Sequence, residues 1–347
     1  MKRYQRQLSL NEIGIEGQKK LLAASVAIVG CGGLGSIVAP YLAGAGIGHL
    51  LLIDGDIPDI SNVHRQVFFT GEEKETKAKV LGDKIKQLNP EIEVRVVGER
   101  MQKTNIYRIL DKIDLVIECT DDIQCKYLVN DFCTLQNIPL VYGAIYKFEG
   151  YVSIFKNATS SDVHLRDIFP SPNNDIPNCS EVGVLNTIAG IIGLLQANEA
   201  IKFILDIGDS LNGYLLSYNA LENRQLKIKC KKIFSEDLHK LFESSQYVIK
   251  GCSVVPEISW EKYKSQPEKY TLISILEKDE HKALDSNVVH VPLSRFSITD
   301  LKEGTNILYC KSGMRSSKLV EELILQGVEN VFSLNEYSLD EIKDHDN

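Results

Sequence analysis

One stretch, residues 26–56, constrains the fold of this chain more than any other. It reads VAIVGCGGLGSIVAPYLAGAGIGHLLLIDGD: an apolar strand, a glycine-rich turn, a helix, and a second apolar strand that ends in aspartates. Gly30, Gly32 and Gly35 form the pattern G-x-G-x-x-G directly after the first strand. In this pattern the first glycine permits a tight turn, the second lets a phosphate approach the backbone, and the third lets the helix lie close to the strand. The stretch therefore predicts a βαβ unit in an α/β domain with a mostly parallel sheet.

The same turn predicts a nucleotide site. Its exposed N–H groups and the dipole of the helix that follows favour a phosphate anion. Asp54 follows at the spacing at which an acid meets a ribose hydroxyl. A βαβ turn that binds nothing is the simpler alternative, but the strand, the helix and the acid together favour a nucleotide, of a kind that the turn alone does not specify.

Composition narrows the function classes. The 347 residues are enough for two or three domains, and the net charge of −8 gives no indication of nucleic acid or of an anionic membrane as partner. The eight cysteines are scattered, unlike a secreted disulfide framework, so we expect reduced thiols and a cytoplasmic setting. The N-terminus lacks the apolar run of a signal peptide, and the apolar segment 182–205 is interrupted by polar residues, which predicts a buried helix rather than a membrane span.

Polar residues follow the second strand of the predicted unit. Asn62, Arg65 and Gln66 lie beyond Asp54 and Asp56, and ligands of open α/β sheets bind outside the carboxyl ends of strands. Lys77 then begins an amphipathic helix that ends before Asn89-Pro90. Most helix lysines are solvated, so position alone assigns no role to Lys77.

A later strand, 115–119, ends in Thr120-Asp121-Asp122. Two acids at the carboxyl end of a strand beside a phosphate loop are placed to hold Mg²⁺. Alternatively, Thr120 or Asp121 caps the helix that follows, and both roles are compatible.

Between residues 147 and 230, strands and helices no longer alternate regularly. We predict a hairpin over 147–156, which contains Gly150 and alternating apolar residues, and two strands within 213–230. Between them, a polar loop over 160–180 ends at Cys179, just before the long apolar helix. A cysteine at this place is either a nucleophile with a lowered pKa or a small buried hydrophobe, and position alone does not decide.

A second unit begins near Ile258. Its strand 306–309 runs into Cys310-Lys311-Ser312-Gly313-Met314-Arg315-Ser316, and a helix follows. Backbone N–H groups around the sulfur, together with Arg315, favour a thiolate or persulfide anion at Cys310.

These motifs resemble the ThiF/MoeB/HesA family, the bacterial ubiquitin-activating-like adenylyltransferases. The resembling segments, in order, are RYQRQ (3–7), GCGGLG (30–35), DGD (54–56), SNVHRQ (61–66), Lys77, CTDD (119–122), NCSEVGV (178–184) and GIIGLLQANEAIK (190–202). CKSGMRS (310–316) is similar to a rhodanese active-site loop. The resemblance implies a Rossmann-like, mostly parallel sheet with an antiparallel extension in an adenylation domain over 1–245, a linker over 246–256, and a small α/β rhodanese-like domain over 257–347.

The resemblance also implies a reaction: Mg-ATP-dependent adenylation of the C-terminal Gly-Gly carboxylate of a ubiquitin-like sulfur carrier, in thiamine-thiazole or molybdopterin biosynthesis. Asp121 would bind Mg²⁺, and Arg6 would reach the ATP of a neighbouring subunit, which implies a homodimer. The implied nucleotide-binding set is Gly30, Gly32, Gly33, Gly35, Asp54, Asp56, Asn62, Arg65, Lys77 and Asp121.

Two cysteines acquire implied roles in sulfur transfer. Cys179 stands at the family's conserved-cysteine position, and Cys310 would carry persulfide sulfur, supplied by a cysteine desulfurase, to give a thiocarboxylate. Some family features are missing. The chain has no C-x-x-C pair, with LRDIFP (165–170) where the first pair is expected, so we predict no structural zinc. Asp122 replaces the family's asparagine, and two rhodanese motifs read Ser274-Ile275-Leu276 and Asn335-Glu336.

Three alternatives remain open from the residues. An NAD-dependent oxidoreductase would use the glycine turn and Asp54, but it leaves Arg65, Lys77 and Asp121 unexplained. Adenylation of a different carbonyl substrate, in a peptide or tRNA, keeps the same site. A non-catalytic binding module with a sensor-like second domain does not account for the retained adenylation residues.

Overall fold

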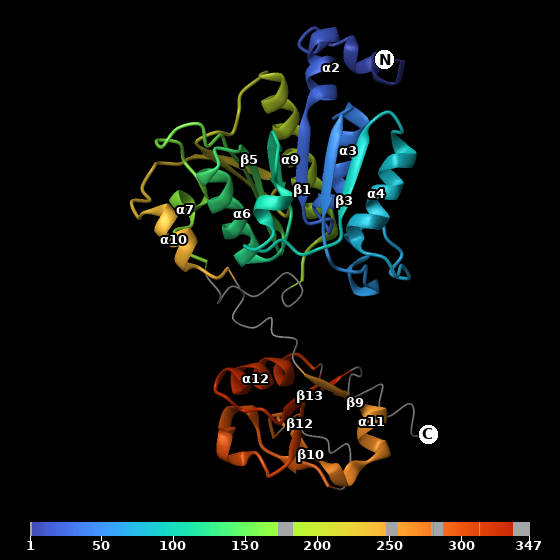
Figure 1. The fold of residues 1–347 in the computed structure, drawn as a ribbon, viewed down its shortest axis with the longest axis vertical. Coiled ribbons are helices and arrows are strands. Elements are labelled where there is room, and N and C mark those ends of the chain that lie inside the picture. Colours follow the sequence, from blue (N-terminus) through green and yellow to red (C-terminus); the bar gives the residue numbers. More distant parts are fainter. Residues whose placement is uncertain are drawn as a thin grey trace. The chain divides into compact units, whose positions relative to one another are not determined.

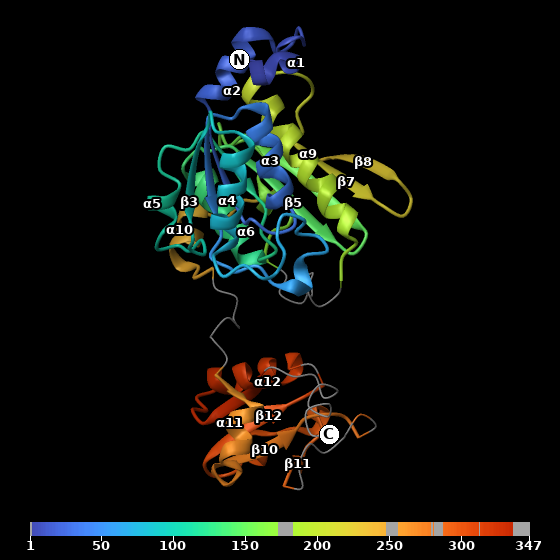
Figure 2. The ribbon, with the colours of Figure 1, turned by 90° about the vertical axis from the view of Figure 1, so that its right-hand side faces the viewer.

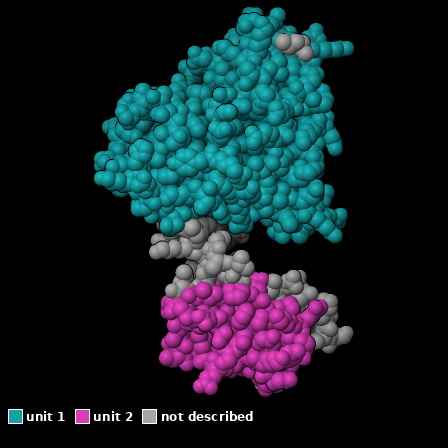
Figure 3. Space-filling view, in the orientation of Figure 1, with its two compact units in different colours: residues 1–247 teal, residues 248–347 magenta. Residues whose placement is uncertain are grey.

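The chain divides into two compact units, residues 1–247 and 248–347 (Figure 3). The structure is a computed structural model that describes residues 2–172, 183–247, 256–278, 280, 287–311 and 313–335. Each unit is built around its own sheet and its own hydrophobic core.

The first unit contains an eight-stranded sheet in the order β3-β2-β1-β4-β5-β6-β7-β8. Strands β3 to β5 in this order pair in parallel, and β6, β7 and β8 are added antiparallel, which confirms the predicted architecture. The strands are β1 (Ser25–Val29), β2 (His49–Ile53), β3 (Glu93–Val97), β4 (Leu115–Glu118), β5 (Leu140–Tyr146), β6 (Glu149–Phe155), β7 (Tyr214–Asn219) and β8 (Arg224–Lys229).

Helices cover both faces of this sheet (Figures 1 and 2). The α-helices are α1 (Gln5–Leu8), α2 (Gly14–Ala23), α3 (Gly35–Ala45), α4 (Lys77–Leu88), α5 (Ile106–Ile109), α6 (Ile123–Leu135), α7 (Leu165–Ile168), α9 (Asn186–Leu205) and α10 (Leu238–Ser244), with short 3₁₀ turns η1 (Lys2–Tyr4) and η2 (Ile60–Asn62). Along β1, Val26 and Ile28 belong to the core beneath α3, α4 and α9. Ala27 and Val29 belong to the opposite core, beneath α5, α6 and α10. This alternation is the period of a strand buried on both faces.

Helix α9 is the one described helix whose length and apolar composition would suit a membrane span, and half of that window is buried inside the protein. It packs against α3 and against strands β5 and β6. Its polar residues take part in this packing, since Gln196 and Glu199 are buried. The prediction of a buried helix agrees with these contacts.

The predicted hairpin over 147–156 is wrong. Strand β5 continues to Tyr146, the chain turns at Lys147, whose φ is +52°, and a single strand, β6, returns beside β5. Gly150 lies inside β6 rather than in a turn. A Cβ at this position would lie 2.2 Å from Cγ1 of Ile192 on α9, so the glycine serves close helix–sheet packing.

The second unit contains a five-stranded, fully parallel sheet in the order β11-β10-β12-β13-β9. Its strands are β9 (Glu257–Ser259), β10 (Tyr270–Ser274), β11 (Val289–His290), β12 (Thr305–Tyr309) and β13 (Val331–Asn335). Its helices are α11 (Trp260–Ser265) and α12 (Met314–Leu325), with 3₁₀ turns η3 (Pro267–Lys269), η4 (Leu293–Arg295) and η5 (Ile298–Asp300). Strands β9 and β13 were not predicted from the sequence.

Candidate functional site

The glycine turn between β1 and α3 is too tightly packed for side chains at two positions. Gly30 has a φ of +91°, and a Cβ there would lie 2.9 Å from the backbone of Cys119 and Thr120. A Cβ on Gly35 would lie 1.9 Å from the carbonyl oxygen of Gly30. The turn therefore needs both glycines, and it lies directly against the peptide that follows β4.

Asp54 is bound to the backbone of this turn. Its carboxylate accepts the N–H of Cys31 at 2.7 Å and the N–H of Asp56 at 2.8 Å. Burial raises the pKa of Asp54 above its ordinary value. The carboxylate is thus fixed at the carboxyl end of β2, next to the glycine turn.

Lys77 is the first residue of α4, as predicted, and it is buried. Its Nζ lies 3.3 Å from Oδ2 of Asp56, while Arg100 donates to Oδ1 of Asp56 at 2.8 Å. Burial alone would raise the pKa of Asp56, but Lys77 and Arg100 outweigh it and hold that pKa below its ordinary value. The sequence analysis missed Arg100, although it follows β3 and so lies at the same edge of the sheet.

Arg65 and Gln66 lie over the glycine turn. A Cβ on Gly33 would be 3.6 Å from Cγ of Arg65, and a Cβ on Gly32 would be 3.2 Å from Nε2 of Gln66. Both side chains are at least nine-tenths buried. The carbonyl oxygen of Asn62 accepts the backbone N–H groups of both residues, at 3.1 and 3.0 Å.

Two polar side-chain atoms beside this turn are buried without a hydrogen-bond partner among the described residues: Oε1 of Gln66 and Oγ of Ser36. Unsatisfied buried groups cost about 1–3 kcal/mol each, and such groups are typical of sites that a ligand completes. The glycine turn, the cations Arg65 and Lys77, and these two atoms together fit a phosphate-bearing ligand.

Asp121 and Asp122 have different surroundings. Oδ1 of Asp122 accepts the N–H groups of Gln124 at 2.8 Å and Cys125 at 3.2 Å, so Asp122 is the N-cap of α6. The predicted cap at Thr120 or Asp121 is therefore wrong, because the residue directly before the helix is the one that reaches these donors. Asp121 is exposed.

No group of three or more His, Cys, Asp or Glu side chains converges on a metal position within the described residues. A single exposed carboxylate still fits Mg²⁺, which is commonly held by one or two carboxylates together with substrate phosphates. The residues present are therefore compatible with Mg²⁺ that arrives with a nucleotide.

Beneath Asp121 lies a buried ion pair that the sequence analysis missed. Glu118, the last residue of β4, is fully buried and pairs with Lys126 of α6. Lys126 also donates to the carbonyl oxygen of Gly143 at 2.8 Å. Burial would lower the pKa of Lys126, but Glu118 outweighs it and raises that pKa, so Lys126 stays charged.

Arg6 does not reach the glycine turn of its own chain. It is an exposed residue of α1, and its neighbour Gln7 donates to the carbonyl oxygen of Ala45, the last residue of α3, at 3.0 Å. The glycine turn leads into the first residue of α3, whereas α1 lies at the other end of α3 (Figure 2), so Arg6 is about 15 Å, one helix length, from the turn.

The two predicted sulfur residues differ in what the structure describes. Cys179 lies outside the described residues. Cys310 is buried at the carboxyl end of β12, and its sulfur accepts the N–H of Ser316 at 3.4 Å and the hydroxyl of Ser316 at 3.7 Å. Arg315 pairs with Glu280 at 2.7 Å.

The family's second cysteine pair is expected in the segment after Cys230, which has none, and a carboxylate joins this segment to residues 165–170. Asp167 of α7 accepts the N–H groups of Ile233 at 2.8 Å and Phe234 at 2.7 Å, and the ammonium group of Lys232 lies 3.1 Å away. Burial would raise the pKa of Asp167, but backbone N–H donors, among them that of His164, outweigh it and hold that pKa below its usual range.

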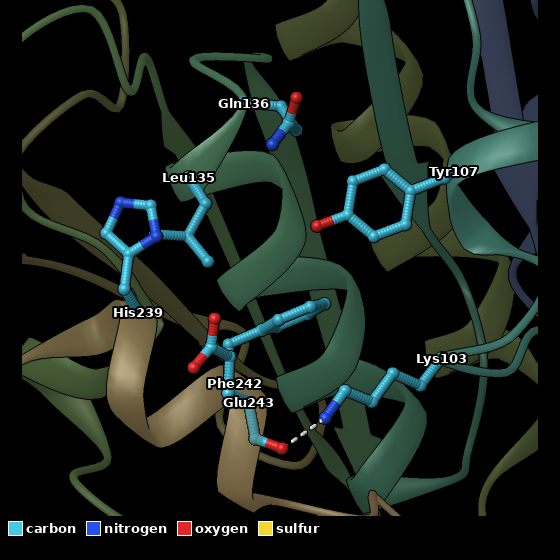
Figure 4. Close-up of a pocket in the computed structure, with 7 residues that line it drawn as sticks. All are labelled: Lys103, Tyr107, Leu135, Gln136, His239, Phe242 and Glu243. Carbon is cyan, nitrogen blue, oxygen red and sulfur yellow. Dashed lines mark hydrogen bonds between the residues drawn. The ribbon is translucent and has the colours of Figure 1, made fainter.

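A cavity of about 310 Å³ lies elsewhere, between α5, α6 and α10 (Figure 4). Tyr107 and Phe242 line it, and Lys103 donates to the carbonyl oxygen of Glu243 at 2.6 Å. None of the predicted site residues lines this cavity, and Lys103 instead satisfies carbonyl groups at the end of α10.

The chain matches the model of the ThiF family over residues 4–239. It is 40% identical to the "Sulfur carrier protein adenylyltransferase" of Thermus thermophilus, over 66% of this chain and 87% of that one. It is 34% identical to a "Probable molybdopterin-synthase adenylyltransferase" of Porphyra purpurea, over 90% and 86% of the two chains. A "Probable adenylyltransferase/sulfurtransferase MoeZ" of Mycobacterium tuberculosis is 33% identical over 91% and 86%.

Solved structures share the fold. A crystal structure of E. coli MccB with ATP superposes with a TM-score of 0.55 at 22% identity, covering 67% of this chain and 72% of that one. A second, with the selenomethionine form of MccA and AMPCPP, has a TM-score of 0.57 at 21% identity and covers 68% and 73%. At this identity the likeness establishes the fold of the first unit.

Proposed function

Because the chain belongs to the ThiF family and is an adenylyltransferase, we propose that it adenylates the C-terminal Gly-Gly carboxylate of a ubiquitin-like sulfur carrier. The observation that carries this proposal is the pair of buried cations, Arg65 and Lys77, beside the glycine turn. In adenylation, negative charge moves onto the departing pyrophosphate and two such cations balance it, whereas hydride transfer moves no charge onto phosphate. The oxidoreductase alternative is therefore not retained.

The chemistry follows from these residue types. A carboxylate oxygen of the substrate forms a bond to the α-phosphorus of ATP, and the bond from that phosphorus to pyrophosphate breaks. No general base is required, because the attacking carboxylate is already ionised. Arg65 and Lys77 balance the negative charge that moves to the leaving group, while the turn fixes the position of the phosphates. Mg²⁺ beside Asp121 would supply further charge neutralisation when bound.

A protein substrate is supported by the antiparallel extension of the sheet. Leu226 and Ile228 of β8 are exposed at 48% and 47%, and they share one face because they are two positions apart in one strand. Exposed apolar side chains in a row on a sheet are typical of a protein-binding surface. A folded carrier would rest there while its extended tail reaches the nucleotide.

A homodimer is supported by the position of Arg6. Since Arg6 lies at the far end of α3 from its own glycine turn, it serves a nucleotide only in another copy of the chain. A groove of about 950 Å³ beside Gln7 is lined by residues of α3, α4 and α9, among them the exposed Tyr41, Leu88 and Leu194. We propose this apolar groove as part of the contact between the two copies.

Mixing two inactive variants tests the shared site. In a heterodimer of Arg6→Ala and Lys77→Ala chains, one site has both intact residues and the other has neither. An equal mixture after subunit exchange is expected to recover about a quarter of the wild-type rate. A mixture that stays as inactive as its components contradicts the shared site.

The second unit is proposed to deliver sulfur. The terminal sulfur of a persulfide on Cys310 attacks the carbonyl carbon of the acyl-adenylate, and AMP leaves. A second thiol then reduces the resulting acyl disulfide, so that a thiocarboxylate is released and a disulfide forms between the two thiols. A cysteine desulfurase is the proposed source of the persulfide sulfur.

ATP–pyrophosphate exchange tests the proposed function directly. We expect exchange that depends on a carrier ending in Gly-Gly and stops when its last glycine is removed. Mass spectrometry of the carrier, with a sulfur donor present, is expected to detect the exchange of one oxygen for sulfur. Absence of exchange with carriers of both the thiazole and the molybdopterin type would contradict the proposal, and exchange with one type identifies the pathway.

A further inference from the structure

The ion pair between Glu118 and Lys126 lies at the turn that carries Asp121. Glu118 is fully buried, and the side chain of Lys126 is 7% exposed. Oε1 of Glu118 accepts the backbone N–H of Thr120 at 2.8 Å and also the hydroxyl of Thr120. One carboxylate thus binds a helix, through Lys126, and the backbone of the turn, through Thr120.

Stability is a poor explanation for such a pair. The desolvation of two charges can exceed their mutual attraction, and apolar residues of similar volume commonly serve a fold as well or better. A buried ion pair is better explained if it fixes the backbone in one of several possible conformations. The conformation held here is that of residues 119–122.

Asp121 lies between two anchored residues. Thr120 is bound to Glu118 on one side, and Asp122 is bound to the first turn of α6 on the other. The backbone of Asp121 is thereby fixed, while its side chain is exposed. The same turn touches the glycine turn, since a Cβ on Gly30 would lie 2.9 Å from the nitrogen of Thr120.

Two further contacts fix the base of this arrangement. Lys126 donates to the carbonyl oxygen of Gly143 on β5, and the amide of Gln196 on α9 donates to the carbonyl oxygen of Glu118 at 2.7 Å. Glu118 therefore connects β4, β5, α6 and α9 at the edge of the sheet where the nucleotide is proposed to bind.

We propose that Glu118, charged against Lys126 and bound to Thr120, is a positioning residue that holds the carboxylate of Asp121 beside the glycine turn and so sets the magnesium-dependent part of nucleotide affinity. This inference rests on the proposed function only through the nucleotide and its metal. It does not depend on which carboxylate substrate is adenylated.

The expected effect follows from the charge of Asp121. Without a metal, a carboxylate held beside phosphates repels them; with Mg²⁺, the same carboxylate binds the ion that the phosphates share. The gain in ATP affinity on adding Mg²⁺ therefore measures how well Asp121 is positioned. A purely structural ion pair would change stability without changing this ratio.

Calorimetric titration of the full chain with ATP, with and without Mg²⁺ and without a carrier, tests the proposal. Thr120→Val keeps the size of the side chain but removes its hydroxyl donor to Glu118. We expect it to reduce the magnesium gain about tenfold, since a hydrogen bond to a charged group is lost. Thr134→Val is the matched control, because the Thr134 hydroxyl donates at 2.8 Å to the carbonyl oxygen of Asn130, in the same helix.

An Asp121→Asn background separates positioning from other effects. The single Asp121→Asn change is expected to remove most of the magnesium gain and to tighten metal-free ATP binding. Thr120→Val added to this background is expected to change the gain no further, because both changes act through one carboxylate. The proposal is overturned if Thr120→Val leaves the gain in ATP affinity on adding Mg²⁺ at the wild-type level. It is also overturned if Thr120→Val reduces this gain equally in the wild-type and Asp121→Asn backgrounds.

A second variant keeps the test valid if Thr120→Val unfolds the chain. Glu118→Gln with Lys126→Met removes both buried charges at once and leaves neither unpaired. We expect the thermal unfolding temperature to stay near that of wild type while the magnesium gain falls; an unchanged gain overturns the proposal. Failure of carrier-dependent exchange would contradict the proposed function while leaving these titrations interpretable.

Discussion

Two loops of this protein occupy the same place between a strand and a helix, but different parts of the chain supply their functional groups. Each follows a buried parallel strand and precedes a helix: the glycine turn connects β1 to α3, and the segment that begins at Cys310 leads from β12 to α12. In the first loop, Gly30 and Gly35 leave no room for side chains, and the cations come from Arg65 and Lys77 elsewhere in the chain. In the second loop, the hydrogen bonds converge on the sulfur of Cys310, a side chain of the loop itself.

One local arrangement, a strand followed by a loop and a helix, thus suits two kinds of chemistry. The glycine turn has no side chain at Gly30, Gly32, Gly33 and Gly35, so an anion that a ligand brings can approach its backbone. In the second loop, the backbone N–H and the hydroxyl of Ser316 are directed at the sulfur of Cys310. The first loop therefore depends on Arg65 and Lys77, which lie elsewhere in the chain. In the second loop, the donors to the sulfur of Cys310 belong to Ser316, six residues further on. Variants in the two loops can therefore test the two units separately.

Removal of Lys77 is expected to have the largest effect. Lys77→Ala takes away a buried cation beside the phosphates and leaves Asp56 with Arg100 alone, so ATP–pyrophosphate exchange should fall about 10³-fold. Lys79→Ala is the control, because Lys79 lies in the same helix, is half exposed and pairs only locally with Asp83. Exchange that falls equally in both variants would show that the cationic charge at Lys77 is not specific.

Cys310→Ala tests the independence of the second loop. We expect thiocarboxylate formation to slow at least about tenfold, while ATP–pyrophosphate exchange stays at the wild-type rate, because persulfide chemistry needs the thiolate. Cys230→Ala, a partly exposed free cysteine in the first unit, is the control for loss of a thiol. A parallel fall in exchange would mean that the two loops do not divide the work as described.

Gly35→Ala tests the packing that the glycine turn requires. A methyl group 1.9 Å from the carbonyl oxygen of Gly30 is expected to lower the free energy of unfolding by about 2–3 kcal/mol, measured by urea denaturation. Gly190→Ala in α9 is the control, since no atom lies within 4 Å of its Cβ position, and it should stabilise the helix by about 0.4–1 kcal/mol. Equal stability of the two variants would contradict the close approach of β1 and α3.

Ser316→Ala is expected to have the smallest effect. It removes the hydroxyl that lies 3.7 Å from the sulfur of Cys310 but keeps the backbone N–H at 3.4 Å. Alkylation of Cys310 by iodoacetamide should therefore slow only about two- to threefold at pH 7, because the weaker of two donors is lost. A slowing as large as that of sulfur transfer in Cys310→Ala would show that the hydroxyl, and not the backbone, carries the thiolate.

The features that were predicted correctly from the sequence depend on a few neighbouring residues. The end of β1, the glycine turn and the start of α4 at Lys77 agree with the structure, because turn glycines and amphipathic periodicity are encoded within a few residues. The antiparallel extension was implied by the family resemblance, and the two strands within 213–230 were expected from the residues and are β7 and β8. The hairpin at 147–156 failed, because the role of Gly150 depends on Ile192, a residue 42 positions away, and no local pattern reports that contact.

The missed residues share a physical cause. Glu118 ends an apolar strand and is charged in a buried position, which only its partner Lys126 on the next helix makes tolerable. Arg100 lies beyond β3 and meets Asp56 only because parallel strands bring their carboxyl ends to one edge. Strands β9 and β13 are the outer two on one side of their sheet, and β9 is only three residues long, so neither has a strong pattern of its own.

The contact between Asp167 and residues 232–234 has a consequence for what controls this part of the fold. Where cysteine pairs bind zinc, the supply of metal controls such a contact; here the protonation state of Asp167 controls it. Because the folded pKa of Asp167 is depressed, its contribution is complete above the unfolded pKa, about 3.9 for aspartate, and is lost as pH falls through the folded value. Chelators and thiol oxidants have no target in this contact, so acid is the condition that loosens it.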